Sequence, residues 1–409
     1  MRLLIVSQYF WPESFRINEI AKTLVEKGIE VVVLTGKPNY PRGTIFPGYC
    51  AWGCQRESYQ GININRIPLL PRGGGGWRLA LNYASFVLSG LIFAPWILRG
   101  KKFDAIFIYA PSPILQTIPA IFLGWIKRCP VVLSVQDLWP ESLAATGYVQ
   151  NKTVLKLVER VVRFIYKHTD LLLVQSRAFV ESVSALASGT RVMYYPNSVD
   201  ASFTKPAGSN IPDVPGLGSG FSVMFAGNIG SAQAVAVIVE AATILREYSE
   251  IHFVILGDGS LREWMLQEAQ QRGLSNLHLP GSFPVETMPG FMQQASVLLV
   301  TLADQPIFAL TVPNKVQAYM ASGRPIIASL NGEGARLVLE AGAGLAAPAE
   351  NATALADTIL SLYRETPADR ETMGNNGRRY FQEHFNHDRL IDQLIVILQS
   401  EIRRGKGVE

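Results

Sequence analysis

Cysteine and charge are both scarce in this sequence. The three cysteines among 409 residues are too few, and odd in number, for a disulfide framework, which fits a reducing cytoplasm. Cys50 and Cys54 have no second pair and no nearby histidine, so we expect no zinc site. Charged residues make up 17% and hydrophobic residues 48% of the chain. This composition excludes a disordered protein and a coiled coil.

Two nucleotide-binding fingerprints are absent as well. After the first apolar run the sequence reads VSQYFWPESFR, without G-x-G-x-x-G, and no Walker A pattern occurs. Dehydrogenase and P-loop functions therefore lose most of their support. The N-terminal apolar run is too short for a signal peptide and lacks a small-residue cleavage site, so we expect a buried strand there.

The net charge of +4 is small but unevenly distributed. Residues 1–200 contain 22 Lys and Arg against 12 Asp and Glu, whereas residues 201–409 contain 15 against 21. A basic half joined to an acidic half suggests that the first half faces an anionic partner.

One stretch of 20 residues, Leu79–Leu98, has no charged residue. It is long enough to span a bilayer, but Asn82, Ser85, Ser89 and Pro95 weaken it as a span. A transmembrane span, a buried helix and a helix lying in the membrane interface are the three alternatives.

Strands and helices alternate on both sides of residues 205–220, a segment rich in Gly, Pro and Ser. This pattern predicts an α/β protein of two doubly wound parallel-sheet domains, 1–204 and 221–387, that face a cleft. Residues 388–409 are predicted to form a helix that crosses back to the first domain. The expected strands are Leu3–Ser7, Val31–Thr35, Ala105–Tyr109, Val131–Val135, Leu171–Val174, Ser222–Ala226, His252–Leu256, Val297–Thr301 and Ile326–Ser329.

The segment Phe308–Ser329, FALTVPNKVQAYMASGRPIIAS, points to an anion site. Pro313 suits a first helical turn, and the backbone N–H groups around it lie free at the helix start. Lys315 adds a positive charge, so a diphosphate is the natural occupant. The alternative is a plain loop–helix junction with Lys315 in solvent.

Several motifs in matching order resemble the family 4 glycosyltransferases with the GT-B fold. They are the segment above, SQYFWPESFRINEIA, PNSVD (Pro196–Asp200), FAGNIGSAQ (Phe225–Gln233) and LGDGS (Leu256–Ser260). SQYFWPESFRIN, LTGKPNYPRG, DLWPES and TVPNKVQAYMASGRPI are similar to the branch that includes the O-antigen N-acetyl-L-fucosamine transferases. The resemblance covers nearly the whole chain.

This resemblance implies two Rossmann-like domains, with the donor nucleotide held mainly by the second. It implies a retaining transferase that needs no metal or other cofactor and uses a UDP-sugar, with an N-acetylated deoxyhexosamine expected. The acceptor would be a polyprenyl-diphosphate-linked saccharide in surface polysaccharide (O-antigen or capsule) biosynthesis. The enzyme would be cytoplasmic and peripheral on the inner face of the cell membrane, with no nucleic-acid partner.

The sequence departs from the family pattern in the second domain. The two family glutamates eight positions apart correspond to Leu310 and Ala318, which leaves ribose binding unassigned apart from Gln317. The family's diphosphate-gripping Arg and Lys correspond to Asn228 and Gln233. The expected donor-binding residues are Gly227, Asn228, Gln233, Gly257, Asp258, Gly259, Phe283, Thr311, Val312, Pro313, Asn314, Lys315 and Gln317. Among them Phe283 is either a wall of the base site or a core residue.

The first domain departs from the pattern in its N-terminal loop. The family's paired glycines correspond to Phe15 and Arg16, and its histidine after the fourth strand corresponds to Gln136. Asp137 would orient the acceptor hydroxyl or act as a base, or else it hydrogen-bonds a turn. The catalytic candidates are Asp137, Lys315 and Arg16, and the acceptor-binding candidates are Glu13, Arg16, Arg72, Arg78, Gln136 and Asp137.

Two basic segments suggest contact with phosphate or lipid. Arg72 and Arg78 flank four glycines that could hold a lipid pyrophosphate or form a flexible loop. A predicted helix carries a basic stripe opposite an apolar face, which is typical of a solvated helix or of one that meets anionic lipid. The stripe consists of Lys156, Arg160, Arg163 and Lys167.

Two other functions compete with glycosyl transfer. A GT-B UDP-sugar epimerase would rearrange the sugar without an acceptor, but it would need acidic and histidine groups that we cannot place. A membrane-associated, non-catalytic scaffold is suggested by the loss of both family glutamates, at Leu310 and Ala318.

Overall fold

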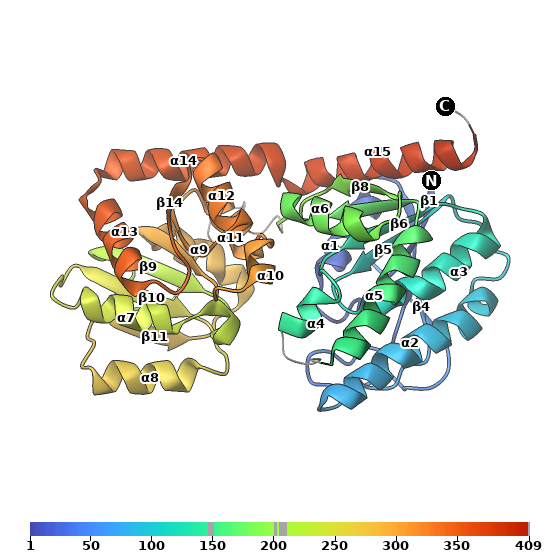
Figure 1. Cartoon of the computed structure of the whole chain (residues 1–409), viewed down its shortest axis with the longest axis horizontal. Helices are drawn as coiled ribbons and strands as arrows, with labels where there is room; N and C mark the ends of the chain where they lie inside the picture. The colour runs from blue at the N-terminus through green and yellow to red at the C-terminus, as the bar shows by residue number, and fades with distance from the viewer. Residues whose placement is uncertain (146–150, 200–202, 204–210, 408–409) are drawn as a thin grey trace. The chain divides into compact units, whose positions relative to one another are not determined.

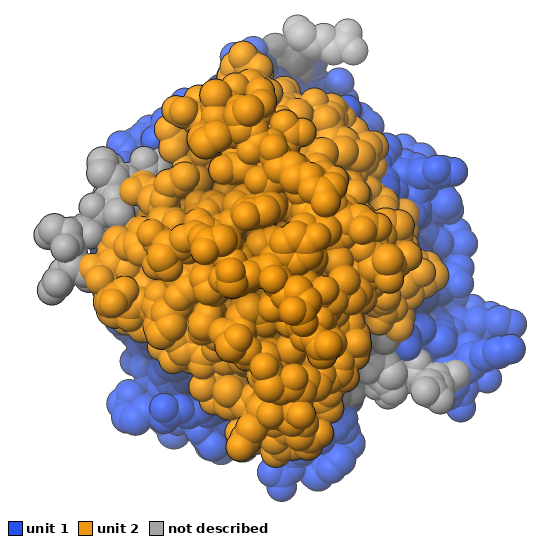
Figure 2. Space-filling model, turned by 90° about the vertical axis from the view of Figure 1, so that its left-hand side faces the viewer, with its two compact units in different colours: residues 1–196, 388–409 blue, residues 197–387 orange. Residues whose placement is uncertain are grey.

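The computed structural model describes residues 1–145, 151–199, 203 and 211–407. The chain divides into two compact units, coloured separately in Figure 2. Unit 1 comprises Met1–Pro196 and Asp388–Glu409, and unit 2 comprises Asn197–His387.

The boundary between the units differs from the predicted linker at 205–220. Residues 205–210 and Asp200 lie outside the described part. Residues 211–220 belong to unit 2, where Val214 and Leu217 are buried in its hydrophobic core. Because these apolar side chains pack into the core, the segment 211–220 is part of unit 2 and does not form a linker.

Unit 1 contains an eight-stranded sheet in the order β3-β4-β2-β1-β5-β6-β7-β8, parallel except for the antiparallel β3–β4 pair. Three strands were not predicted, because β3 (QRESY) and β4 (ININR) are polar and β8 (RVMY) is only partly buried at the sheet edge. The strands are β1 Arg2–Val6, β2 Glu30–Thr35, β3 Gln55–Tyr59, β4 Ile62–Arg66, β5 Ala105–Ala110, β6 Val131–Val135, β7 Leu171–Val174 and β8 Arg191–Tyr194.

Helices cover both faces of this sheet (Figure 1). On one face α1 (Arg16–Glu26) and α15 (His387–Gly405) share a core with the strands, so the C-terminal helix returns to the first unit as predicted. The hydroxyl of Tyr195 donates to the Leu390 carbonyl at 2.8 Å and helps to fix α15. The remaining helical elements are α2 Gly76–Ile97, η1 Ile114–Gln116, α3 Thr117–Lys127, α4 Glu141–Ala145, α5 Lys152–Lys167 and α6 Arg177–Leu186.

Unit 2 contains a fully parallel sheet in the order β11-β10-β9-β12-β13-β14. The strands are β9 Phe221–Ala226, β10 Ile251–Leu256, β11 Leu277–Gly281, β12 Val297–Thr301, β13 Ile326–Ser329 and β14 Gly344–Ala347. The edge strands β11 (LHLPG) and β14 (GLAA) were not predicted, because neither contains a β-branched residue.

Separate hydrophobic clusters cover the two faces of the unit 2 sheet. Helices α7, α8 and α13 contribute to one cluster, and α9, α11, α12 and α14 contribute to the other. In such a sheet, ligands bind beyond the carboxyl ends of the strands. The helical elements are η3 Ser231–Gln233, α7 Ala236–Ile244, α8 Arg262–Gln271, η4 Val285–Thr287, α9 Met288–Gln294, α10 Pro306–Ala309, α11 Asn314–Ser322, α12 Glu333–Glu340, α13 Ala352–Arg364 and α14 Pro367–His384.

Candidate active site

Glycines at the carboxyl ends of β9 and β10 bring two loops into direct contact. Gly227 and Gly257 have φ values of 135° and 142°, which only glycine adopts readily. A Cβ at Gly257 would lie 1.9 Å from the Gly227 carbonyl oxygen, and one at Gly259 would lie 2.3 Å from that of Ile229. Asp258 is exposed, and its carboxylate accepts from the Gly259 N–H at 2.8 Å. The Gly-Asp-Gly turn therefore has a packing role, and it leaves backbone close to any ligand at this edge.

Lys315 lies in the first turn of α11, beside these loops. Its Nζ is 3.6 Å from the centroid of the Phe225 ring, and a Cβ at Gly227 would lie 2.6 Å from its Cε. The Nζ is buried, and burial lowers the pKa of Lys315 to about 7. The alternative of a lysine side chain in solvent is therefore wrong.

The rest of α11 is fixed against β9. The Tyr319 hydroxyl accepts from the Ala226 N–H at 2.9 Å, and Val316 and Met320 are fully buried. Because Tyr319 lies one turn beyond Lys315, this contact sets where the helix begins.

The other predicted donor residues have local partners. The Asn228 amide donates to the Gln233 side chain at 2.9 Å, so two neutral groups replace the family's cations. Phe283 is half-buried, 4.8 Å from Phe291 between ring centroids, which favours its role as a core residue. The Thr311 hydroxyl donates to the Ile307 carbonyl at 2.9 Å.

Three further positions frame the start of α11. Val312 is buried, Pro313 is half-buried, and Asn314 is exposed and accepts a 3.5 Å hydrogen bond from the Asn197 amide. Gln317 is 2% exposed, and its Oε1 has no hydrogen-bond partner among the described residues. Ala318, at a family glutamate position, is buried as a small apolar residue.

Asp137 follows β6 at the carboxyl edge of the unit 1 sheet. Burial raises its pKa to about 7, which is suited to a base near neutral pH. Tyr109, near the end of β5, is buried, and its pKa is raised by burial; the charge of Arg16 lowers this pKa and that of Asp137 raises it. Arg16 and Asp137 thus each lie near a tyrosine that the sequence did not single out, because it sits within an apolar strand.

Gln136 and Glu13 both form hydrogen bonds within unit 1. The Gln136 amide donates to the Ser134 hydroxyl at 2.8 Å, and its carbonyl accepts from Gln175 at 2.6 Å. The Glu13 carboxylate is 2% exposed and accepts from the backbone N–H groups of Asn39 (2.8 Å) and Tyr40 (2.7 Å). Burial raises its pKa and these hydrogen bonds oppose the rise. Glu13 therefore fixes a loop, contrary to the expectation that it binds the acceptor.

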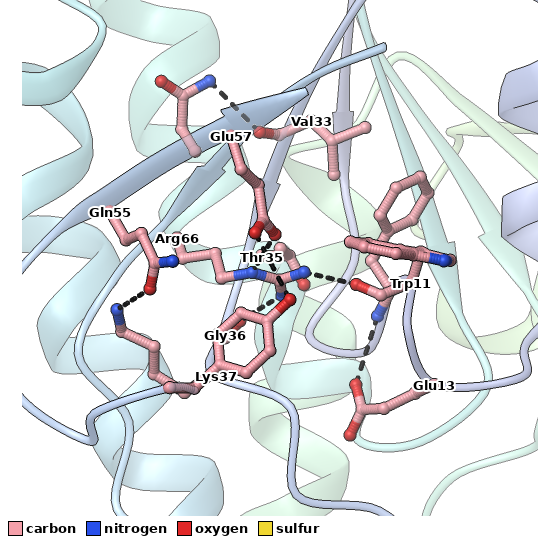
Figure 3. A network of polar contacts seen from close by, with 12 residues as sticks. Trp11, Glu13, Val33, Thr35, Gly36, Lys37, Gln55, Glu57 and Arg66 are labelled. Carbon is pink, nitrogen blue, oxygen red and sulfur yellow. Dashed lines mark hydrogen bonds and ion pairs between the residues drawn. The ribbon is translucent and has the colours of Figure 1, made fainter. Parts of the chain in front are cut away.

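Arg66, at the end of β4, organises a buried network that the sequence did not reveal (Figure 3). Its fully buried guanidinium pairs with Glu57 at 2.5 Å and donates to the carbonyls of Gly36 (3.0 Å) and Trp11. The Tyr49 ring lies 4.9 Å from it. A single arginine in a polar strand carries no pattern that distinguishes it from an exposed one.

Arg72 and Arg78 lie in different surroundings. Arg72 lies 5.5 Å from the Tyr40 ring, and the Tyr9 ring, stacked on Phe15 at 5.1 Å, is 5.8 Å from Tyr40. Arg78 is exposed and lies over Trp77. The glycines between the two arginines are partly fixed, since the Gly73 N–H donates to the Gly43 carbonyl at 2.9 Å.

The basic stripe on α5 is exposed as expected, and the same helix also exposes apolar side chains. Lys156, Arg160, Arg163 and Lys167 are all exposed, but Arg163 pairs with Glu159 at 2.8 Å. Leu157 and Phe164 of the same helix are 60% and 42% exposed. The mixture of basic and apolar side chains is typical of a helix at a membrane surface.

Helix α2 contains most of the uncharged stretch, and it is the one helix in the described part that is long and apolar enough to cross a membrane. Its polar residues face the protein: the Asn82 amide donates to the Leu70 carbonyl at 2.6 Å, and Asn82 accepts from Gln8 at 2.7 Å. Several of its large apolar side chains are exposed, with Leu88, Ile92 and Trp96 at 60–66%, whereas Phe86 and Ile97 are buried. These contacts favour a helix packed on unit 1 with one bare apolar stripe.

Comparisons with known proteins agree with this architecture. The family model described as "Glycosyl transferase 4-like domain" matches residues 14–198, and "Glycosyl transferases group 1" matches residues 220–365. WbjE of Pseudomonas aeruginosa, named as a glycosyltransferase, is 25% identical over 86% of each chain. WcaI of Escherichia coli K12, named for glycosyl transfer in colanic acid biosynthesis, is 25% identical over 79% of this chain and 82% of its own.

Solved structures share the fold at low sequence identity. Sucrose-phosphate synthase of Thermosynechococcus elongatus superposes with a TM-score of 0.75 at 17% identity, covering 98% of both chains. HepE of Anabaena in complex with UDP gives 0.69 at 14% identity, covering 98% of this chain and 100% of its own. The predicted GT-B fold and enzyme class are confirmed. The chain therefore belongs to the family 4 glycosyltransferases of the GT-B fold.

Proposed function

We propose that the enzyme transfers a sugar from a UDP-sugar with retention of configuration and without a metal. The observation that carries this proposal is the Nζ of Lys315 in the first turn of α11, which is buried without a hydrogen-bond partner among the described residues and lies beside the glycine loops after β9 and β10. A helix start and a lysine together suit a diphosphate. Relatives of the fold such as HepE have been solved with UDP, which supports a UDP-sugar donor.

In this mechanism the protein stabilises the departing diphosphate. Lys315 and the N–H groups at the start of α11 bind the charge that develops on the leaving oxygen. That oxygen helps to deprotonate the acceptor hydroxyl on the same face of the sugar. Asp137, whose pKa is about 7, orients the hydroxyl or accepts its proton.

We propose a polyprenyl-diphosphate-linked saccharide as the acceptor and an N-acetylated deoxyhexosamine as the transferred sugar. The branch resemblance supports both, and the name of WcaI supports a role in surface polysaccharide synthesis. Arg72 over the Tyr40 ring offers a cation and an aromatic surface for such an acceptor.

Thermal shift with saturating UDP, GDP and TDP tests the donor site. We expect UDP to raise the melting temperature most, and no rise with any of the three would overturn the proposal. Product formed from a UDP-sugar alone would indicate the epimerase. Absence of transfer with every donor in a folded, UDP-binding protein would indicate the scaffold.

We further propose that the enzyme is peripheral on the inner face of the cell membrane. Helices α2, α3 and α5 lie next to one another in unit 1 (Figure 1). Asp104 is the only acidic residue in the sequence between Glu57 and Asp137, against seven Lys and Arg besides the buried Arg66. A basic surface with bare apolar side chains complements anionic lipid. The exposed large apolar residues of these helices are Trp77, Leu81, Leu88, Ile92, Trp96, Trp125, Ile126, Val154, Leu157 and Phe164.

Co-sedimentation with vesicles of phosphatidylglycerol and phosphatidylethanolamine tests this surface. The double variant Leu88→Ser, Ile92→Ser should weaken binding by at least tenfold, since burying one such side chain contributes about 1.5–3 kcal/mol. Ile244→Ser, Leu339→Ser is the matched control, because both residues are exposed in unit 2. Equal losses in the two variants, or binding by neither protein nor variant, would overturn the membrane proposal.

A further inference from the structure

Lys315 differs from the cations of unit 2 that form ion pairs. Arg272 and Arg336, for example, pair with carboxylates at 2.8 Å. The Nζ of Lys315 is buried without a hydrogen-bond partner in the described part of the chain. A buried ammonium without a partner is costly, so this position favours the neutral amine.

Among the described residues, the groups around Lys315 do not supply a counter-charge. Phe225 of β9 presents its ring face, and the Tyr319 hydroxyl of α11 is bound to Ala226, with a pKa raised by burial. Asn228 and Gln233, in the loop after β9, are neutral and bonded to each other. The ring attracts an ammonium weakly, but burial is the larger effect and brings the lysine pKa to about 7.

We propose that Lys315 is stored as a neutral amine against Phe225 and takes up one proton from solvent when it binds the diphosphate of a nucleotide. The inference rests on the proposed donor site. The amine lone pair gains the proton, no other bond changes, and the proton returns to solvent when the nucleoside diphosphate leaves. The diphosphate provides the negative charge that the ring lacks, so the ammonium is the stable form in the complex.

This coupling makes nucleotide affinity depend on pH. The pKa of Lys315 is about 7 in the free protein and rises in the complex, so the affinity for the nucleotide reaches its maximum below pH 7. Above pH 7 the dissociation constant should rise about tenfold per pH unit, because one proton is bound with each nucleotide.

Calorimetric titration with UDP at pH 8.5, in two buffers of different ionisation enthalpy, measures the proton directly. The second phosphate pKa of about 6 means that UDP itself exchanges no proton at this pH. We expect uptake of about one proton per UDP. Lys315→Met should bind UDP weakly, with no uptake and no pH dependence. Arg246→Met, which removes an exposed cation from the same unit, should leave uptake unchanged.

A second variant tests the role of the ring. Phe225→Leu keeps the site apolar and removes the cation–π attraction, so the lysine pKa should fall further. Uptake at pH 7 should then increase from about one half toward one proton per UDP.

The results separate this inference from the proposed function. UDP binding without proton uptake, or uptake that persists in Lys315→Met, would overturn the inference and leave the donor site intact. Failure of UDP, GDP and TDP to bind at any pH would overturn the donor site itself.

Discussion

Each unit holds one buried titratable side chain at the carboxyl edge of its sheet, an acid in unit 1 and a base in unit 2. Unit 1 has a carboxyl, Asp137, and unit 2 has an amine, Lys315, and burial brings the pKa of each to about 7. Burial accounts for both shifts, with no contribution from a neighbouring charge in the described part of the chain. Each unit therefore holds one group near the midpoint of its titration at neutral pH, which is a pattern typical of functional sites.

The surfaces of the units differ as strongly. With the boundary between Pro196 and Asn197, unit 1 has 26 Lys and Arg against 15 Asp and Glu, whereas unit 2 has 11 against 18. The structural division thus sharpens the asymmetry visible in the sequence. Under the proposed function, Lys315 would bind a diphosphate within an acidic unit, where the overall charge repels an anion and a local cation is needed.

The largest expected effect separates the roles of the two buried groups. Asp137→Asn should reduce transfer by about 10²–10⁴-fold if Asp137 accepts the acceptor proton. In the wild type, kcat/KM for the donor should peak near pH 7, since Asp137 must lose its proton and Lys315 must hold one. At saturating donor, kcat should rise through pH 7 and then level off, because the diphosphate keeps Lys315 charged.

Steady-state pH profiles from pH 5.5 to 9 measure both quantities. Asp137→Asn should lose the acidic limb, and Lys315→Met should lose the alkaline limb of kcat/KM. Full activity in a folded Asp137→Asn protein would reduce Asp137 to a turn residue.

Removing a buried ion pair from unit 1 should lower the free energy of unfolding more than removing an exposed ion pair from unit 2. Arg66→Met should destabilise the protein by about 3–5 kcal/mol, because it removes the ion-pair partner of the half-buried Glu57 carboxylate and the donor to the carbonyls of Gly36 and Trp11. Arg272→Met removes a more exposed pair in unit 2 and should cost less than about 1 kcal/mol. Urea unfolding followed by tryptophan fluorescence compares them. Equal losses would show that the Arg66 network is not a structural core.

Stability should respond to pH in opposite directions in two variants. Asp137 binds its proton more tightly in the folded than in the unfolded protein. The loss in free energy of unfolding caused by its burial therefore grows from about pH 4 to 7 and persists above pH 7. Lys315 binds its proton less tightly in the folded than in the unfolded protein. The loss in free energy of unfolding caused by its burial is therefore greatest below pH 7 and disappears as the pH approaches 10.5. Asp137→Asn should therefore raise the free energy of unfolding at pH 8, and Lys315→Met should raise it at pH 6, each by up to roughly 4 kcal/mol.

Chemical unfolding of the nucleotide-free protein at both pH values measures this contrast. A stabilising effect of either variant that does not change with pH would show that its charge is not the source. Such a result would leave only a difference in packing.

The sequence predicted the repeated α/β pattern, because buried parallel strands are apolar on both faces and leave clear signals. It also predicted the α11 segment and Lys315, since a helix start next to a lysine is a local pattern. It did not predict Tyr109 beside Asp137 and Arg16, or Arg66 beside Trp11, because those contacts join distant segments. The error at Glu13 has the same origin: its backbone partners lie 26 and 27 residues away.

The smallest expected effect lies on α5 and distinguishes free from paired cations. Arg160 and Arg163 are both exposed, but only Arg163 has a described ion pair, with Glu159 at 2.8 Å. A free cation near an anionic membrane contributes about 1 kcal/mol, whereas a cation already paired contributes less. Arg160→Gln should therefore weaken vesicle binding by about fivefold, and Arg163→Gln by less.

Co-sedimentation at low and high salt measures the two variants side by side. Both differences should shrink at high salt, because screening weakens contacts between exposed charges and lipid headgroups. If Arg163→Gln loses as much binding as Arg160→Gln, Glu159 does not neutralise its partner at the membrane. If neither loses any, the apolar stripe of α2 carries the contact without α5, and the charge asymmetry between the units has another cause.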